Sequence, residues 1–341
     1  MRRLTSLLIA ASVLILAGCV SHVEISDKVM GTTMKIEAVS RSLSKEELNR
    51  AVLDAIGAAK KVDRLMSTWQ PDSEISRLNR AEPGEWIALS PETYDVLVMA
   101  TDVAKKTGGA FDITVGPLVD LWGFGPKSPP VPTDVPSDQA IEAAKAVVGF
   151  KHILIDANNR RAARDAEGVE VDLGGIAKGY AVDLAVAALQ RHGVTDALVE
   201  IGGETAAVGL NEKNEPWLIG VRHPNRPMGR FLTTIELRDA AIATSGDYFN
   251  VYEVKGRLYS HIIDPATGRP ITNNVCSVTV LAKTCAPADA LATALMVMGP
   301  GKAIKLVETM PDVEAIIAWR TGRDTIEVKA SRGARRHHLN P

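Results

Sequence analysis

Cysteine is scarce in this chain of 341 residues, which contains only Cys19, Cys276 and Cys285. The sequence has neither a Cys-x-x-Cys pair nor a cluster of histidine with cysteine, which argues against a structural zinc site. Cys276 lies in an apolar, strand-like segment, and spacing alone cannot pair it with Cys285. A disulfide and two buried thiols therefore both remain open.

An excess of one charge is also missing. The chain has 39 Lys and Arg residues against 41 Asp and Glu, for a formal net charge of −2. This balance gives no broad electrostatic reason to expect a nucleic-acid partner. The one basic run is residues 331–341, which we interpret as a solvated C-terminal tail. An apolar share of 46% provides ample material for a core.

Two familiar nucleotide-binding motifs are absent, the P-loop Gly-x-x-x-x-Gly-Lys-Ser/Thr and the Rossmann Gly-x-Gly-x-x-Gly. Instead, the segment DLGGIAKGYAVD at Asp172–Asp183 passes from a predicted strand (Val169–Leu173) through paired glycines into a helix. Such a helix start directs backbone N–H groups and Lys178 toward an anion such as phosphate. A simple strand-to-helix turn with a surface lysine is the alternative.

The N-terminus lacks a hydrophobic run long enough to span a membrane comfortably. Its apolar segment Leu7–Leu16 follows two arginines, which is typical of an export signal. The sequence LAGC ending at Cys19 resembles a bacterial lipobox, so we expect residues 1–18 to be a signal peptide and Cys19 to be lipidated. The protein is then expected on the periplasmic side of a bacterial membrane, with the inner or outer membrane left open by Val20.

Periodicity and helix signals predict alternating short elements across the chain. Helices are predicted from Ser44 to about Leu65, from Ser90 to Gly108, from about Ser137 to Val148, over residues 286–298 and from about Lys302 to Thr309. Strands are predicted at Met34–Val39, near His152–Ile155, at residues 197–201, Trp217–Val221, Phe231–Leu237, 241–245, Val278–Ala282, Ala315–Arg320 and Thr325–Lys329. The Pro-rich residues 126–138 are interpreted as an exposed excursion.

Glycines and aromatic residues gather at Gly109–Gly125, which holds four glycines, three aromatics and two aspartates. Asp112 beside Phe111 offers a partner for a hydroxyl or amine next to an apolar surface, and glycine lets the backbone approach a ligand closely. A buried turn with a capping aspartate is the alternative. Trp69, at the exit of the first helix, is either a core residue or a flat surface for a ring system.

Polar residues are concentrated in the stiff segment Tyr259–Pro270, where His261 precedes a tight turn. An ordinary hairpin with a surface histidine is the alternative. Farther along, Asp289 and Thr293 lie four residues apart, so they share one helix face. Hard oxygen ligands suit Mg²⁺, although an isolated pair would also fit an aspartate at a helix N-terminus and a packed threonine.

Together these segments strongly resemble the ApbE family, the FAD:protein FMN transferases. The motifs occur in order at Met30–Thr32, Met66–Trp69, Gly109–Pro117, Ile176–Tyr180, Ser260–Pro265 and Ala288–Thr293. The resemblance implies one α+β domain over residues 30–330, with mixed β-sheets flanked by helices and an FAD site in a central cleft. We expect residues 19–29 to form a tether that joins this domain to the lipid anchor.

The resemblance also implies particular site residues. The FAD site would be lined by Met30, Trp69, Ala110, Phe111, Asp112, Asp172, Lys178 and Ile263. Mg²⁺ would be held by Asp289, Thr293 and the carbonyl of Gly175, a position where many relatives have alanine. Trp69 stands where tyrosine is common, which keeps an aromatic face.

The family reaction moves FMN from FAD to a threonine of an exported acceptor, such as a subunit of a Na⁺-pumping or electron-transfer membrane complex, and releases AMP. Lys178 would offset the pyrophosphate charge, as phosphoryl transfer requires. His261 is our candidate for the residue that deprotonates the threonine, since a neutral imidazole is a competent base near neutral pH. A Mg²⁺-dependent FAD pyrophosphatase and a non-catalytic flavin-binding lipoprotein are the alternative functions.

Overall fold

The computed structural model describes residues 20–128, 134–225, 230–248, 250–322, 325–334 and 338–339. The expected signal peptide and Cys19 lie outside these described residues. Within them, Cys276 and Cys285 are buried free thiols, which answers the question that their spacing left open.

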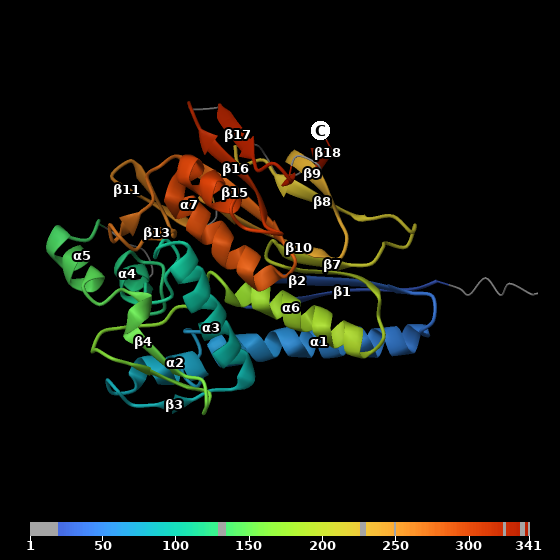
Figure 1. Cartoon of the computed structure of the whole chain (residues 1–341), viewed down its shortest axis with the longest axis horizontal. Helices are drawn as coiled ribbons and strands as arrows, with labels where there is room; N and C mark the ends of the chain where they lie inside the picture. The colour runs from blue at the N-terminus through green and yellow to red at the C-terminus, as the bar shows by residue number, and fades with distance from the viewer. Residues whose placement is uncertain are drawn as a thin grey trace, which may run out of the picture.

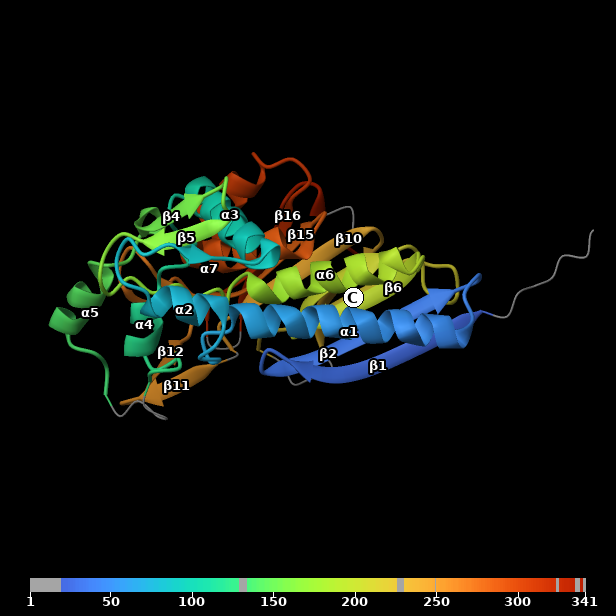
Figure 2. The ribbon, with the colours of Figure 1, turned by 90° about the horizontal axis from the view of Figure 1, so that it is seen from below.

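The centre of the molecule is an eight-stranded sheet in the order β1-β2-β6-β7-β10-β15-β16-β17. Every neighbouring pair in it is antiparallel. Its strands are β1 (Ser21–Val29), β2 (Thr32–Ser40), β6 (Asp196–Ile201), β7 (Glu204–Val208), β10 (Ala240–Gly246), β15 (Val275–Ala282), β16 (Glu314–Arg320) and β17 (Ile326–Ala330). Figures 1 and 2 show this sheet as the layer on which the rest of the chain is built.

Three long helices cover one face of the sheet: α1 (Lys45–Met66), α6 (Ala177–Arg191) and α7 (Cys285–Val307). The helices α1 and α6 run side by side (Figure 2), and α7 packs on β10 and β15. Helix α7 is really two helices, because Gly299 adopts a non-helical conformation with φ of 74° just before Pro300. Among the described residues, α7 alone is long and apolar enough to cross a membrane, yet it lies in the core of the fold.

The opposite face of the sheet is covered by the strands β8 (Trp217–Arg222), β9 (Phe231–Leu237) and β18 (His338–Leu339). A second apolar cluster joins the two sheets, since Trp217 and Leu237 pack with Ile242 of β10 and Ile316 of β16. Helices on one face and strands on the other give an α+β fold, as the sequence predicted.

A smaller lobe lies at one end of this sandwich (Figure 1). It contains α4 (Gly116–Leu121), α5 (Asp138–Lys145), the short helix Phe150–His152, and the short strands β11 (Val251–Val254), β12 (Arg257–Ser260), β13 (Ile263–Asp264) and β14 (Arg269–Pro270). The helices α2 (Glu74–Arg80) and α3 (Pro91–Lys106) and the short strands β3 (Ile87–Ala88), β4 (Ile153–Asp156) and β5 (Arg161–Arg164) pack on the main core beside α1 and α7. The segments around Leu118, Trp122, Ile141 and Ile263 share a third apolar cluster. Chain segments far apart in the sequence therefore meet in this lobe.

Three expectations differ from the structure. Residues Ser21–Val29 form strand β1 instead of a tether, because the alternating Val23, Ile25 and Val29 pair them with β2 through a tight turn. Residues Val169–Leu173 are not a strand but carry one isolated bridge, between Val115 and Glu170, because the backbone N–H and carbonyl of Val171 are hydrogen-bonded to the side chain of Asn79.

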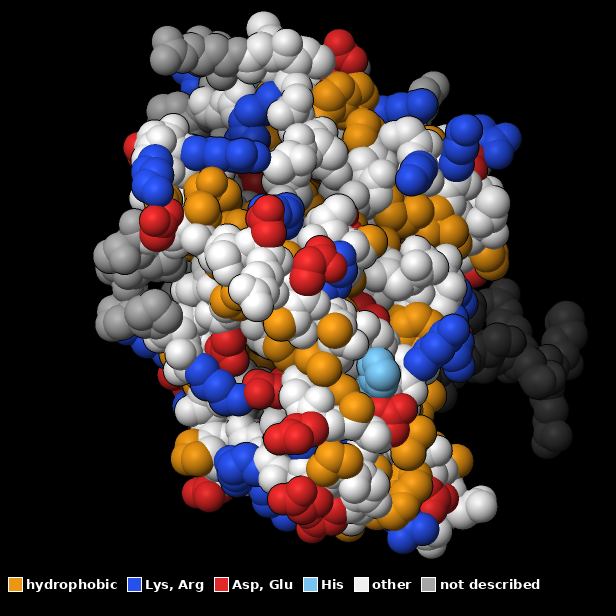
Figure 3. Space-filling view, turned by 90° about the vertical axis from the view of Figure 1, so that its left-hand side faces the viewer, with side chains coloured by type: hydrophobic (Ala, Val, Ile, Leu, Met, Phe, Trp, Pro, Cys, Tyr) orange, Lys and Arg blue, Asp and Glu red, His pale blue; other side chains and the backbone are white. Residues whose placement is uncertain are grey.

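The C-terminal residues were expected to be a solvated tail. Instead, Ser331 and Ala334 are buried, and His338 and Leu339 pair with β9. The two buried residues are small, so the basic composition of the run concealed their place in the fold. On the face shown in Figure 3, positive and negative side chains are interspersed, which agrees with the balanced net charge.

Candidate active site

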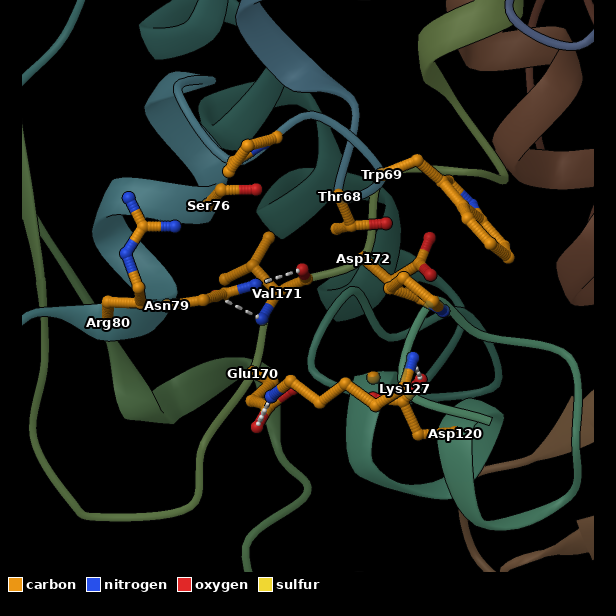
Figure 4. A pocket seen from close by; sticks show the side chains of 13 residues that line it. Thr68, Trp69, Ser76, Asn79, Arg80, Asp120, Lys127, Glu170, Val171 and Asp172 are labelled. Carbon is orange, nitrogen blue, oxygen red and sulfur yellow. Dashed lines mark hydrogen bonds and ion pairs between the residues drawn. The ribbon is translucent and has the colours of Figure 1, made fainter. Parts of the chain in front are cut away.

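An open pocket of about 230 Å³ lies where the exit of α1 faces α4 and the segment before α6. Trp69, Asp172 and Lys127 stand around the opening (Figure 4). Trp69 is 68% exposed. Its indole is therefore not a core side chain but a free aromatic face at the rim of the pocket, the second of the two possibilities that the sequence left open.

Asp172 lines this pocket and lies just before the Gly174-Gly175 turn into α6. Its Oδ1 accepts a hydrogen bond of 2.6 Å from the backbone N–H of Gly174. Burial raises the pKa of the Asp172 carboxyl, although that hydrogen bond acts in the opposite direction. The carboxylate is held in a fixed orientation toward the pocket.

Lys127 and Glu170 also line the pocket, and sequence reasoning missed both of them. The Lys127 ammonium lies 2.5 Å from Glu170 Oε1, and its backbone N–H donates to Asp120 Oδ1 at 3.0 Å. Lys127 belongs to the Pro-rich segment that was interpreted as an exposed excursion. The segment thus supplies a cation to the pocket, and nothing in its composition indicated that.

Lys178, in the first turn of α6, lies within a cluster of buried charges. Its Nζ is 2.7 Å from Glu204 Oε1 and 3.6 Å from Asp289 Oδ1, and both carboxylates are almost fully buried. Burial by itself lowers the pKa of Lys178, but the charges of Asp289 and Glu204 outweigh it and raise that pKa above its ordinary value. The ammonium is therefore charged at neutral pH.

Glu204 is a third residue that the sequence did not single out. Burial raises the pKa of the Glu204 carboxyl, and the Lys178 ammonium opposes this effect. The signal in the sequence was the pair Gly202-Gly203 directly before it, which repeats the Gly-Gly pattern ahead of Lys178. Both glycines have positive φ, 63° and 108°, and form the tight turn between β6 and β7 that places Glu204.

Helices α6 and α7 cap each other with aspartates. Asp289 of α7 accepts a hydrogen bond of 3.0 Å from the backbone N–H of Gly179 in α6. Asp183 of α6 accepts bonds of 2.7 and 2.9 Å from the N–H groups of Cys285 and Ala286 at the start of α7. Burial raises the pKa of Asp183 to about 6. These bonds fix the two helix starts relative to each other, and with them Lys178 and Asp289.

Thr293, one turn beyond Asp289, faces the loop before α6. Its Oγ1 lies 3.3 Å from Ser245 Oγ. A Cβ added at Gly175 would lie 3.4 Å from Thr293 Oγ1 and 3.1 Å from a ring carbon of Phe111, so these three residues meet at one point. The carboxylate of Asp289, the hydroxyl of Thr293 and a carbonyl of Gly175 are hard oxygen donors, and this donor set fits Mg²⁺.

Asp112 makes the hydrogen bonds expected of a capping aspartate in a buried turn, which was the alternative interpretation of this residue. Its Oδ1 accepts from the N–H and the hydroxyl of Thr114 at 2.8 and 2.6 Å, and its Oδ2 accepts from the N–H of Phe150 at 2.7 Å. The same residue lines a second cavity, of about 400 Å³, with Gly109 and Pro265. Ala110 is half-buried against the main core.

Met30 and Ile263 lie in structurally constrained places. Met30 has φ of 51°, a left-handed conformation that is uncommon for its side chain, in the turn between β1 and β2. Its N–H donates to Asp63 Oδ2 at 3.4 Å. The Ile263 side chain is buried in the third apolar cluster with Leu118 and Trp122, so it contributes to the core of the small lobe.

His261 follows β12 and packs edge-on against Phe124, with ring centroids 6.2 Å apart. Burial and, to a lesser extent, the charge of Lys178 lower the pKa of its imidazole to about 4, although a hydrogen bond with the backbone of Asn250 acts in the opposite direction. Its Nδ1 is buried and has no hydrogen-bond partner within the described part of the chain. The imidazole is thus neutral at physiological pH and has an unused lone pair or N–H.

Most of the chain matches one known protein family. The ApbE family matches residues 30–317. The chain belongs to this family. As a member of the ApbE family it is a transferase, and its α+β fold is the ApbE fold.

Relatives of this ApbE-family chain share most of its length. The FAD:protein FMN transferase of Vibrio cholerae is 43% identical over 302 residues, which cover 87% of this chain and 89% of that protein. The solved structure of the flavin transferase ApbE from Vibrio cholerae superimposes with a TM-score of 0.82 at 38% identity, covering 93% of this chain and 99% of that one. The ApbE protein of Thermotoga maritima gives 0.83 at 34% identity, covering 94% and 100%.

Proposed function

We propose that the protein transfers FMN from FAD to a threonine hydroxyl of an exported acceptor protein in a Mg²⁺-dependent reaction that releases AMP. The observation that supports this most directly is the convergence of Lys178, Asp289 and Thr293 at the start of α6 in a chain of the ApbE family. A buried cation beside hard oxygen donors suits a pyrophosphate, because negative charge builds up on the leaving AMP oxygen as the P–O bond breaks.

Different residues of the site would bind different parts of FAD. Mg²⁺, held by Asp289, Thr293 and a carbonyl of Gly175, would supply charge neutralisation at the pyrophosphate. Lys178 contributes a second positive charge that is fixed by its ion pairs. Trp69 offers its exposed indole face to a ring of FAD at the rim of the pocket.

In the covalent step, His261 accepts the proton of the threonine hydroxyl. The threonine Oγ attacks the phosphorus of the FMN half, an O–P bond forms, and the P–O bond to AMP breaks with its electron pair on AMP. The hydroxyl proton passes to the neutral imidazole of His261. A buried, neutral imidazole whose Nδ1 has no hydrogen-bond partner among the described residues is suited to accept it.

We further propose that the protein acts at the periplasmic side of a bacterial membrane, anchored by a lipid on Cys19. The support is the sequence LAGC after an apolar export segment. An exported position would place the site among the exported acceptors that the reaction requires.

The deciding experiment mixes the protein with FAD, Mg²⁺ and an exported acceptor domain from a Na⁺-pumping or electron-transfer complex. Mass spectrometry should find the acceptor heavier by one FMN phosphoester on a threonine, with AMP released in equal amount. Free FMN and AMP without acceptor labelling would indicate the pyrophosphatase instead. Bound FAD without any turnover would indicate a flavin-binding protein.

A further inference from the structure

Glu204 is a buried carboxylate in the site that the proposed reaction does not use. It is the first residue of β7 and is 3% exposed. Its Oε1 pairs with the Lys178 ammonium at 2.7 Å, and its Oε2 is buried without a hydrogen-bond partner among the described residues. A buried carboxylate costs free energy unless a charge compensates it, so its presence calls for a function.

Lys178 lies between two carboxylates but is not shared equally. Glu204 is the nearer partner at 2.7 Å, whereas Asp289 Oδ1 lies 3.6 Å from the same nitrogen. Asp289 also accepts the Gly179 N–H through its other oxygen. The Oδ1 of Asp289 is therefore held near the ammonium without a close hydrogen bond to it.

We propose that Glu204 is a positioning residue that keeps the Lys178 ammonium paired, so that Asp289 stays available to a divalent cation. The inference rests on the proposed Mg²⁺ site. With Glu204 present, the three side chains carry a net charge of −1 and attract a divalent cation. Without it, Lys178 and Asp289 neutralise each other, and the cation must compete with an ammonium for the same carboxylate.

The test measures divalent binding without FAD, with Mn²⁺ as the probe and electron paramagnetic resonance of free Mn²⁺ as the readout, at about pH 8. Glu204→Gln should weaken Mn²⁺ binding by about tenfold or more, because the unpaired ammonium moves to Asp289. Glu200→Gln is the matched control. Glu200 lies in the same hairpin and contacts the N–H of Gly203 but not Lys178, so its loss should leave Mn²⁺ binding unchanged.

A double variant separates positioning from direct ligation. In a Lys178→Met background the ammonium is gone, so adding Glu204→Gln should change Mn²⁺ binding by less than about twofold. If Glu204 were itself a metal ligand, the second substitution would weaken binding in that background as strongly as in the wild type. That result overturns the proposal. The double variant leaves no buried unpaired charge at these two positions, so it also serves if Glu204→Gln alone fails to fold.

Two further outcomes are distinguishable. If the wild type binds Mn²⁺ and Glu204→Gln binds it equally well, the inference about Glu204 is wrong while the metal site stands. If the wild type binds no Mn²⁺, or if Asp289→Asn binds it as well as the wild type, the proposed metal site is wrong and the inference falls with it.

Discussion

At the scale of single residues, His261 shows how burial can set a chemical property. An ordinary histidine is half protonated near pH 6.5, whereas burial lowers the pKa of His261 to about 4. The folded protein therefore holds this imidazole neutral over the whole physiological range. A neutral ring is what a base for a threonine hydroxyl requires.

The same property predicts a pH effect on stability. Between about pH 6.5 and pH 4 the unfolded chain binds a proton at His261 that the folded chain does not. The contribution of this residue to the unfolding free energy is therefore complete above pH 6.5 and is lost as the pH falls to about 4, by roughly 3 kcal/mol in total. His261→Gln should abolish FMN transfer and retain FAD binding. Its unfolding free energy should also fall less than that of the wild type as the pH is lowered from 6.5 to 4.

Urea unfolding of both proteins across this pH range, with FAD titrations beside it, checks the prediction. His192→Gln is the control: it replaces an exposed histidine at the end of α6 whose Nε2 lies 2.7 Å from Asp54 Oδ2, a solvent-exposed pair, so it should leave FMN transfer unchanged and alter stability only slightly. If His261→Gln still labels an acceptor at a near wild-type rate, His261 is not the base.

The residue types of the site were visible in the sequence, but their partners were not. Lys178, Asp289 and Thr293 stood out because a lysine after paired glycines and an aspartate four residues before a threonine have chemical uses. Glu204 did not, because its importance lies in a 2.7 Å contact to Lys178, 26 residues earlier in the chain. Asp112 was singled out for a ligand, while the structure shows its oxygens bonded to Thr114 and Phe150.

At the scale of elements, the close approach of α6 and α7 fixes the charged cluster. Gly179 makes it possible, because a Cβ there would lie 2.5 Å from the carbonyl oxygen of Cys285. That carbonyl is backbone at the start of α7 and cannot move without moving the helix. The spacing of Lys178 and Asp289 thus depends on the missing side chain of Gly179.

Gly179→Ala should therefore destabilise the protein by about 1–3 kcal/mol and also weaken Mn²⁺ binding, because it displaces the turn before Asp289. Gly57→Ala in α1 is the matched control. Gly57 is exposed, and its added Cβ would meet nothing within 4 Å. That substitution should stabilise the protein by up to about 1 kcal/mol. Unfolding midpoints in urea measure both effects, and equal midpoints for the two variants would contradict the prediction.

Helices were easier to predict than strands because their ends carry local chemistry. Ser44, Ser90 and Ser137 each accept a hydrogen bond from the backbone at the start of the helix that they were expected to cap. Strand β1 was missed although Val23, Ile25 and Val29 alternate, because its place after the lipobox suggested a linker. A strand is defined by a partner, and among the described residues Val169–Leu173 has only the isolated bridge of Glu170 to Val115, while the backbone of Val171 bonds to the Asn79 side chain.

At the scale of the whole molecule, the site is assembled from segments that only the fold brings together. Trp69, Phe111, Lys178, Glu204 and Thr293 come from different parts of the chain, and the central sheet with its three helices positions them. The fold class could be predicted from the pattern of elements and from the resemblance. The order of eight antiparallel strands could not, because it depends on long-range pairing that local sequence does not encode.

Strand β1 begins close to the expected membrane anchor. The strand begins at Ser21, so a lipid on Cys19 would be only one residue away from the sheet, a reach of about 7 Å at roughly 3.5 Å per residue.

We predict that Cys19→Ser moves the protein from the membrane fraction to the soluble fraction of the periplasm. Its FMN transfer to a soluble acceptor domain should be unchanged, because no residue of the site lies in this segment. Cys276→Ala is the matched control, since it removes a buried thiol and should leave the protein with the membranes. Membrane fractionation with metabolic lipid labelling checks both variants, and a Cys19→Ser protein that remains labelled and membrane-bound would refute the anchor.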